Sequence, residues 1–272
     1  MIIVDTHCHA ATNWFEPIEL ILYQMNLNGV DKAVLIQNGG NYNNQYLLES
    51  VRRFPGRFAA VISVNPSQPD ALATLERWVN EAKGDVAGLR LRPTDRSPGK
   101  DPLAIWRKAA ELGLPVSCFV VNAEHTASPD FRNLVEALPN CTIVLEHLAG
   151  VYRRVSPESA TPPYTAYRTA LELASYPNTY IKFGGLGELC EQPAPLPPRL
   201  TFDKIPPLIE MAYETFGPRR MMWGSDFPPV ASREGYRNAL QGTMNHSAFR
   251  SQEDREYAFA KTALSIWKFP EG

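Results

Sequence analysis

The amino-acid sequence predicts an α/β fold, a (β/α)8 TIM barrel that forms a single domain over residues 1–272. Eight short apolar runs alternate with longer segments of helical periodicity, which is typical of βαβ units and a parallel sheet. The length of 272 residues suits an α/β barrel made as one domain. The alternative is an open, doubly wound sheet. However, the first run leads into His-Cys-His and not into the glycine-rich turn of dinucleotide-binding sheets.

The eight expected strands are short runs rich in apolar and β-branched residues, which favour buried strands. They span residues 2–6, 33–37, 58–64, 86–91, 115–121, 142–145, 179–183 and 220–223. Loops that follow the strands would lie on the active-site face of a barrel. Two of these loops, residues 152–164 and 191–207, are rich in proline and lack periodicity. We expect them to be either substrate lids or walls, or plain surface excursions.

Four helices have recognisable ends, and we expect them over residues 18–28, 101–113, 203–216 and 251–267. The second begins with Asp101 as N-cap and Pro102 at the first helical position. The last begins with a capping box made by Ser251 and Asp254. It then carries one apolar stripe, which consists of Tyr257, Ala260, Leu264 and Trp267.

Composition and charge bound the partners. A net charge of -2 without a basic run gives no indication of nucleic acid. No stretch approaches the roughly 20 apolar residues of a membrane span, and the N-terminus does not resemble a signal peptide. The widely spaced cysteines indicate buried, reduced thiols at Cys8, Cys118, Cys141 and Cys190. We therefore expect a cytoplasmic protein whose partner is a small molecule, with no nucleic acid and no membrane, while association into a homo-oligomer stays open.

The strongest local signal is a His-x-His at the end of the first strand. Side chains alternate along a strand, so His7 and His9 share one face. At the carboxyl end of a barrel strand, that face looks into the mouth of the barrel. Two adjacent imidazoles there can hold one divalent metal ion.

Two further signals end later strands. Asp226 follows the eighth run, which lies beside the first in a barrel, so its carboxylate can bind a metal or accept a proton from water. An N-cap or turn role is the structural alternative for this aspartate. His147 ends the sixth run and is a candidate catalytic residue, as a metal ligand, a proton shuttle or a hydrogen-bond donor to a substrate carbonyl.

Three cations are candidate substrate-binding residues. Arg90 and Arg92 share one face of the fourth strand, and their planar guanidinium groups would suit a substrate carboxylate. The alternative is that they form ion pairs with Asp5, Glu146 or Asp226 and hold the site together. Lys182 on the seventh strand would neutralise a second anionic group or form a structural ion pair.

Five motifs together resemble the amidohydrolase superfamily, in its amidohydrolase 2 branch, and the likeness covers most of the chain. The sequence is most similar to sugar-acid lactonases, 2-pyrone-4,6-dicarboxylate lactonase and related decarboxylases. By this resemblance, His7, His9 and Asp226 surround the reacting water. The motifs are D-T-H-C-H at residues 5–9, G-L-R-L-R-P at 88–93, E-H-L-A-G at 146–150, Y-I-K-F-G-G-L at 180–186 and W-G-S-D-F-P at 223–228.

One departure from the family pattern bears on the cofactor. Metal-dependent members place a further histidine on strand five, where this chain has none, and His125 lies downstream in a loop. Catalytic zinc normally takes three protein ligands, and His7, His9 and Asp226 would supply them. We expect a divalent metal, with zinc as the first choice and manganese as the second. Metal-free catalysis, in which Asp226 alone activates water, stays open because the similar lactonases include metal-free members.

The expected function is that of a hydrolase of the amidohydrolase type, a lactonase acting on a small carboxylated lactone. Asp226 would activate water, and His147 or the metal would polarise the carbonyl. One alternative is a nonoxidative decarboxylase, a lyase on the same scaffold, which the missing strand-five histidine disfavours. Another is a binding barrel without catalysis. The sequence leaves the substrate, the metal and the oligomeric state undetermined.

Overall fold

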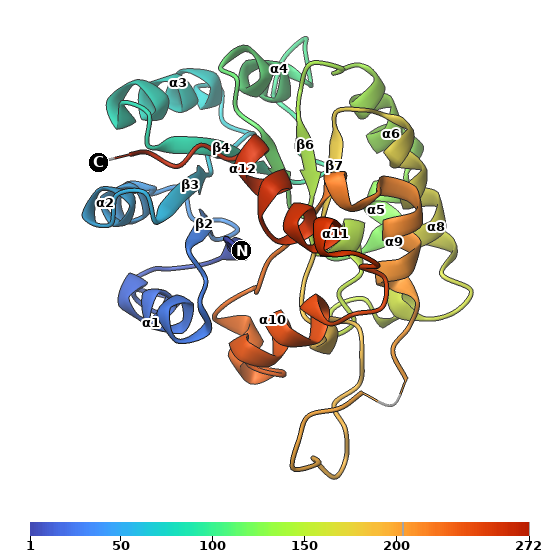
Figure 1. Ribbon diagram of the computed structural model, residues 1–272. Helices are drawn as coiled ribbons and strands as arrows, with labels where there is room; N and C mark the ends of the chain where they lie inside the picture. Colours follow the sequence, from blue (N-terminus) through green and yellow to red (C-terminus); the bar gives the residue numbers. More distant parts are fainter. Residues whose placement is uncertain (203, 272) are drawn as a thin grey trace.

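Eight parallel strands pair in chain order into one sheet that curls into a barrel, and helices surround it (Figure 1). The computed structural model describes residues 1–202 and 204–271. The predicted (β/α)8 barrel is therefore confirmed. The strands are β1 (Val4–Cys8), β2 (Lys32–Ile36), β3 (Phe58–Ile62), β4 (Val86–Leu91), β5 (Val116–Cys118), β6 (Ile143–Leu145), β7 (Thr179–Phe183) and β8 (Met221–Trp223).

The predicted strand positions are correct, but some bounds are not. β1 starts two residues later than expected and extends to Cys8, so that His7 lies within the strand. β5 ends at Cys118 and not at residue 121, because the chain turns there towards Asn122. The side chain of Asn122 caps the next helix by accepting a hydrogen bond from the Glu124 amide.

The barrel closes between β1 and β8. The Asp226 amide donates to the His7 carbonyl at 2.7 Å, and the His9 amide donates to the Phe227 carbonyl at 2.8 Å. Gly224 makes this approach possible, since a Cβ there would lie 2.5 Å from the His7 Cβ. The first and last strands therefore meet at the residues that the sequence singled out.

Twelve α-helical segments accompany the strands in the part of the chain that the structure describes, and the longer ones cover the outside of the barrel (Figure 1). An apolar core fills the space between helices and strands. A second cluster fills one end of the barrel and includes Trp267, the residue directly after α12, together with Val4, Val34, Val61, Val144 and Met222 from the strands. Figure 1 shows α12 lying across this end of the barrel. The helices are α1 (Ile18–Asn28), α2 (Gln45–Arg53), α3 (Ala71–Ala82), α4 (Ala104–Glu111), α5 (Ala123–Ala127), α6 (Pro129–Glu136), α7 (His147–Gly150), α8 (Thr165–Leu171), α9 (Leu208–Phe216), α10 (Tyr236–Met244), α11 (Gln252–Glu256) and α12 (Thr262–Ile266).

The starts of two helices were predicted wrongly. α4 begins at Ala104, so Asp101 is not its N-cap and instead accepts a hydrogen bond from the Leu103 amide. α9 begins at Leu208 and not at residue 203, because two prolines without amide donors precede it directly. Asp203 itself lies outside the described residues.

The last predicted helix is interrupted. The capping box of Ser251 and Asp254 is confirmed. A π-helical turn, Tyr257–Lys261, then separates α11 from α12 and adds a residue to the turn. This rotates the buried face, so that Leu264 is 39% exposed while Ala263 is buried in its place.

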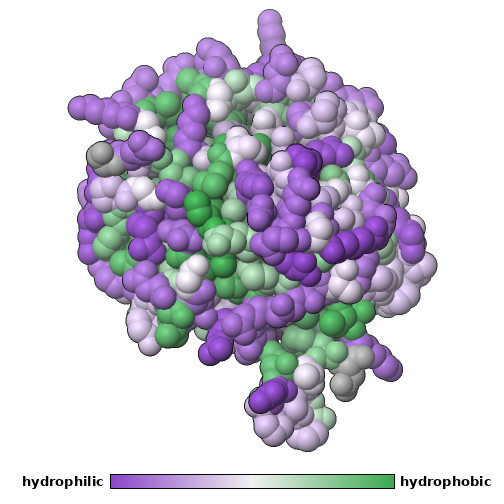
Figure 2. Space-filling model, in the orientation of Figure 1, coloured by the Kyte–Doolittle hydropathy of each residue, from purple (hydrophilic) through white to green (hydrophobic). Residues whose placement is uncertain are grey.

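The positions of the thiols agree with the sequence prediction. All four cysteines are free and buried. Within residues 1–202 and 204–271, no helix combines the length and the apolar character needed to cross a membrane. The loop after β7 projects from the barrel, and apolar side chains stand among polar ones on this projection (Figures 1 and 2).

Candidate active site

The candidate residues gather at the carboxyl ends of the strands. His7 lies in β1, His147 follows β6, Lys182 lies in β7 and Asp226 follows β8. All four line one small cavity of about 10 Å³, together with Phe183, Gly184, Glu188 and Gly224. His7 and Asp226, which are 219 positions apart in the sequence, therefore line the same cavity.

The two carboxylate oxygens of Asp226 have different partners. Oδ2 accepts hydrogen bonds from Arg233 at 2.9 Å and from the Tyr152 hydroxyl at 3.3 Å. Oδ1 faces the Nε2 atoms of His7 and His9 at 3.8 and 3.7 Å. Burial alone would raise the pKa of Asp226, but the His9 contact and the charges of His147 and Arg233 lower it to about 2. Asp226 is therefore a carboxylate anchored on one side and open on the other.

The two histidines of the His-x-His are oriented differently. The Nδ1–H of His9 donates to the Ile36 carbonyl at 2.7 Å, which turns its Nε2 towards Asp226. The Nε2 of His7 is buried and has no hydrogen-bond partner among the described residues. Burial, followed by the positive charges of Lys182 and His147, holds the pKa of His7 well below its usual value. His7 is therefore a neutral imidazole with a free ring nitrogen facing the cavity.

His147 sits in a strained turn. His147, Leu148 and Ala149 have φ values of 48°, 47° and 56°, a left-handed run that costs L-residues about 1–2 kcal/mol each. Such strain persists where surrounding contacts enforce it, which is common at functional sites. Burial lowers the pKa of His147, but Glu188, 3.5 Å from its Nδ1, and Asp226 raise it above the usual value. The turn therefore directs the His147 imidazole at the cavity, and the neighbouring carboxylates favour its protonated form.

A buried ionic network supports the cavity. Arg90 donates to both carboxylate oxygens of Glu146, at 3.2 and 2.7 Å, which realises the ion pair that the sequence left as an alternative. Ser117 donates to Glu146 at 2.7 Å and accepts from Lys182 at 2.8 Å. Burial alone would raise the pKa of Glu146, but Arg90 and Lys182 lower it to about 2. Burial lowers the pKa of Lys182 to about 8.

Arg92 and His125 lie apart from the central cavity. Arg92 follows the end of β4 and is exposed, and it lines a hollow of about 50 Å³ with Arg90 and Phe119. Its guanidinium carbon lies 5.7 Å from the centre of the Phe119 ring. His125 is exposed on α5 and is not part of the His/His/Asp cluster that the described residues form.

Three residues lie close enough together to hold one metal ion. His7, His147 and Asp226 each offer a ligand atom, and these atoms lie within 4.8 Å of one another. This set shares His7 and Asp226 with the expected one and adds His147, while the Nε2 of the expected ligand His9 also lies 3.7 Å from Asp226. The unpartnered Nε2 of His7 fits a metal site, since a buried nitrogen without a partner is costly unless something binds it. The donor set of two imidazoles and one carboxylate suits zinc.

Sequence reasoning missed Arg233, whose side chain is 1% exposed. Besides Asp226, it approaches Glu188 at 3.4 Å and Glu234 at 3.5 Å, and it donates to the Tyr152 hydroxyl at 2.9 Å. These partners come from the loops after β6, β7 and β8. The only sequence signal is its position seven residues after Asp226, which does not identify the partners.

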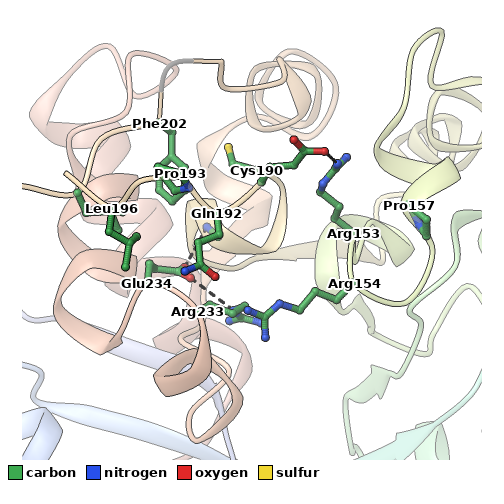
Figure 3. Close-up of a pocket in the computed structure, with 13 residues that line it drawn as sticks. Arg153, Arg154, Pro157, Cys190, Gln192, Pro193, Leu196, Phe202, Arg233 and Glu234 are labelled. Atoms are coloured by element: carbon green, nitrogen blue, oxygen red, sulfur yellow. Dashed lines mark hydrogen bonds and ion pairs between the residues drawn. The ribbon is translucent and has the colours of Figure 1, made fainter.

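A larger pocket of about 310 Å³ lies beside the cavity (Figure 3). Its lining includes Arg153 and Pro157 from the loop after β6, and Leu196 and Phe202 from the loop after β7. Arg233 also lines it. Of the two alternatives for the proline-rich loops, the structure favours walls of a pocket over plain surface excursions.

Two curated proteins are similar to this chain. L-Fucono-1,5-lactonase from Burkholderia ambifaria is 26% identical over 210 residues, which cover 74% of this chain and 66% of that protein. 4-Sulfomuconolactone hydrolase from Hydrogenophaga intermedia is 24% identical over 217 residues, which cover 78% of this chain and 65% of that protein. The matches span slightly less than two thirds of each of these relatives.

The fold also matches that of a solved structure, an amidohydrolase from Burkholderia multivorans with bound zinc. The TM-score is 0.76, the identity is 19%, and the match covers 99% of this chain and 100% of that chain. The profile of the amidohydrolase family matches residues 4–269. Because that match runs from the first strand past the last helix, the chain belongs to the amidohydrolase family.

Proposed function

We propose that the protein is a hydrolase that opens a small carboxylated lactone, a cyclic ester, with water activated by Asp226. The observation that carries this proposal is the unequal environment of the Asp226 oxygens. Arg233 and Tyr152 hold Oδ2, while Oδ1 faces the cavity and both histidines of the His-x-His. Both curated relatives are named for lactones, one as a lactonase and one as a lactone hydrolase, which supports the choice of substrate class.

The reaction follows from the positions of Asp226 and His147. Water at Oδ1 gives a proton to Asp226, and the hydroxide attacks the lactone carbonyl carbon. A carboxylate with a pKa of about 2 is a weak base, so this transfer depends on polarisation of the carbonyl. His147 donates a hydrogen bond to the carbonyl oxygen as negative charge develops there, a contact worth about 3 kcal/mol in comparable sites. The ring C–O bond then breaks, and Asp226 returns its proton to the departing oxygen.

A divalent metal, zinc first and manganese second, would be held by His7, His147 and Asp226. When bound, it would supply Lewis-acid polarisation of the lactone carbonyl. His9 then keeps its contact with Oδ1 and orients the carboxylate. In the metal-free form, the hydrogen bond from His147 supplies the polarisation instead.

The substrate carboxylate would bind at the hollow beside β4. Arg92 offers an exposed guanidinium there, and Arg90 lines the same hollow while it remains paired with Glu146. Bidentate pairing would convert binding into orientation of the ring. Lys182 is nearly fully buried and donates a hydrogen bond to Ser117. It lines the central cavity, so its positive charge acts there and not at the hollow beside β4.

The test is a screen of sugar-acid lactones and aromatic carboxylates, with acid release and carbon dioxide release measured in parallel. We expect acid release from a lactone, and a drop of about 10²–10⁴-fold in kcat for Asp226→Asn. Asp101→Asn, at an exposed loop position, is the matched control and should behave as wild type. Carbon dioxide release without ring opening would instead support the decarboxylase. Unchanged lactone turnover in Asp226→Asn would overturn the proposed mechanism.

A further inference from the structure

The 310 Å³ pocket beside the cavity has one apolar side. Pro193, Leu196, Leu200 and Phe202 line it, and Leu196 is 62% exposed. Figure 3 shows Pro193, Leu196 and Phe202 on one side of the pocket and Pro157 across it, beside Arg153 and Arg154. A volume of about 300 Å³ is at the lower end of the range for pockets that bind small organic molecules. Exposed apolar side chains that converge on a pocket are typical of sites that cover an apolar ligand group.

The opposite side of the pocket carries Arg153 and Arg154, and Glu191 and Glu234 also line the pocket. Arg154 donates to the hydroxyl and the carbonyl of Ser232 at 3.0 and 2.8 Å, and both acceptors are neutral. Among residues 1–202 and 204–271, no carboxylate lies within 4.0 Å of its guanidinium. Arg153, in contrast, is paired with Glu191. Arg154 is therefore a fixed positive charge that its hydrogen-bond partners do not neutralise.

The pocket adjoins the reacting centre. Arg233 lines the pocket and also holds Asp226 at 2.9 Å, so one guanidinium separates the two spaces. The 3-10 turn Leu186–Glu188 makes the same connection, because Gly187 lines the pocket while Glu188 contacts His147. A group bound in the pocket would therefore lie one side chain away from a substrate at Asp226.

We propose that this pocket is a distal subsite that binds an apolar arm of the substrate ending in a second carboxylate, besides the one that would bind at the hollow beside β4. The apolar arm packs against Leu196 and Phe202, and its carboxylate pairs with Arg154. The assignment of the arm to a lactone rests on the proposed function. The binding of an apolar carboxylic acid does not rest on that function, because binding can be measured without turnover.

The test measures binding of 4-phenylbutanoate by titration calorimetry, with 4-phenylbutanol as the neutral probe. We expect the acid to bind at least tenfold more tightly than the alcohol to wild type. Arg154→Met should remove this difference and Arg154→Lys should restore part of it. Leu196→Ser should weaken both probes. Arg52→Met, an exposed arginine on α2, is the matched control and should change neither.

Equal binding of acid and alcohol to wild type, or wild-type binding of both by Arg154→Met and Leu196→Ser, would overturn the subsite. Where a lactone is turned over, 4-phenylbutanoate should also raise KM without lowering kcat. A lower kcat with KM unchanged would place the probe elsewhere and also overturn it. If no lactone is hydrolysed but the binding differences hold, the proposed function fails and the subsite stands.

Discussion

Arg233 determines which oxygen of Asp226 faces the cavity. Its guanidinium and the Tyr152 hydroxyl occupy Oδ2, so the carboxylate cannot rotate without losing both contacts. The same guanidinium faces Glu188 and Glu234, which are buried with it. At the scale of single residues, Arg233 sets the orientation of the Asp226 carboxylate, and it shares its charge with Glu188 and Glu234.

Changing Arg233 should separate orientation from folding. Arg233→Lys keeps the charge but loses the planar contacts, so we expect kcat to fall by about 10–10²-fold, with KM within about threefold of wild type. Arg233→Met should instead lower the free energy of unfolding by about 3–5 kcal/mol, because it leaves buried carboxylates unpaired. Steady-state kinetics and urea unfolding measure the two effects. Wild-type kcat in Arg233→Lys would contradict the orienting role, and Arg52→Met is the control for both.

The buried Lys182 predicts a pH-dependent stability. Its pKa is about 8 in the folded protein, below the ordinary lysine value of 10.5 that applies to the unfolded chain, so the unfolded chain binds more protons between these values. The contribution of Lys182 to stability therefore increases as pH rises from about 8 to 10.5, by about 3 kcal/mol in total. Urea unfolding of wild type and Lys182→Met across this window isolates the effect. A difference that stays constant with pH would show that the pKa of Lys182 is not shifted.

The sequence predicted the site residues whose side-chain direction is set by a strand. It did not predict the site residues that are brought together by loops. His7 and His9 follow from alternation along one strand, and Asp226 follows from its place at a strand end. Glu188 and Arg233 meet only because two loops fold over the mouth, and no periodicity encodes that contact. Arg90 was located correctly, but its pairing with Glu146 was one of two open alternatives.

At the scale of elements, the join between β1 and β8 sets the geometry of the site. Gly224 lies directly against the backbone of His7, and a Cβ there would be 2.8 Å from the His7 nitrogen. The eightfold alternation of strands and helices predicted this join, because it implied a closed barrel. The helix starts were less predictable, since a cap-like Asp101 forms a local turn without starting the helix.

Gly224→Ala should therefore damage both stability and activity. The methyl group would push β1 away from β8, so we expect a loss of about 1–3 kcal/mol in the free energy of unfolding and a lower kcat. Gly242→Ala on α10 is the matched control, because its Cβ would meet only Leu186 at 3.4 Å or more. Thermal unfolding and steady-state kinetics test both variants. Equal losses of stability and kcat in Gly224→Ala and Gly242→Ala would contradict the close contact between Gly224 and His7.

For the whole molecule, metal binding should appear as added stability. An ion that binds only the folded protein contributes about 2.7 kcal/mol at 100 times its Kd. We expect zinc to raise the unfolding temperature of wild type by roughly 5–10 °C and a chelator to reverse the increase. His7→Asn should abolish this shift, while His125→Asn, exposed on α5, should retain it. An equal shift in both variants would place the zinc elsewhere.

Because β1 and β8 meet at the active site, this site can form only late in the synthesis of the chain. The amide of Ser225 bonds to Asp5 across 220 positions, so the first strand must wait for almost all the rest to emerge from the ribosome. Until then, the two imidazoles of the first strand have no carboxylate to face. Such distant pairings close slowly, and a nascent chain stalled before Asp226 would hold an open sheet edge but no reacting centre.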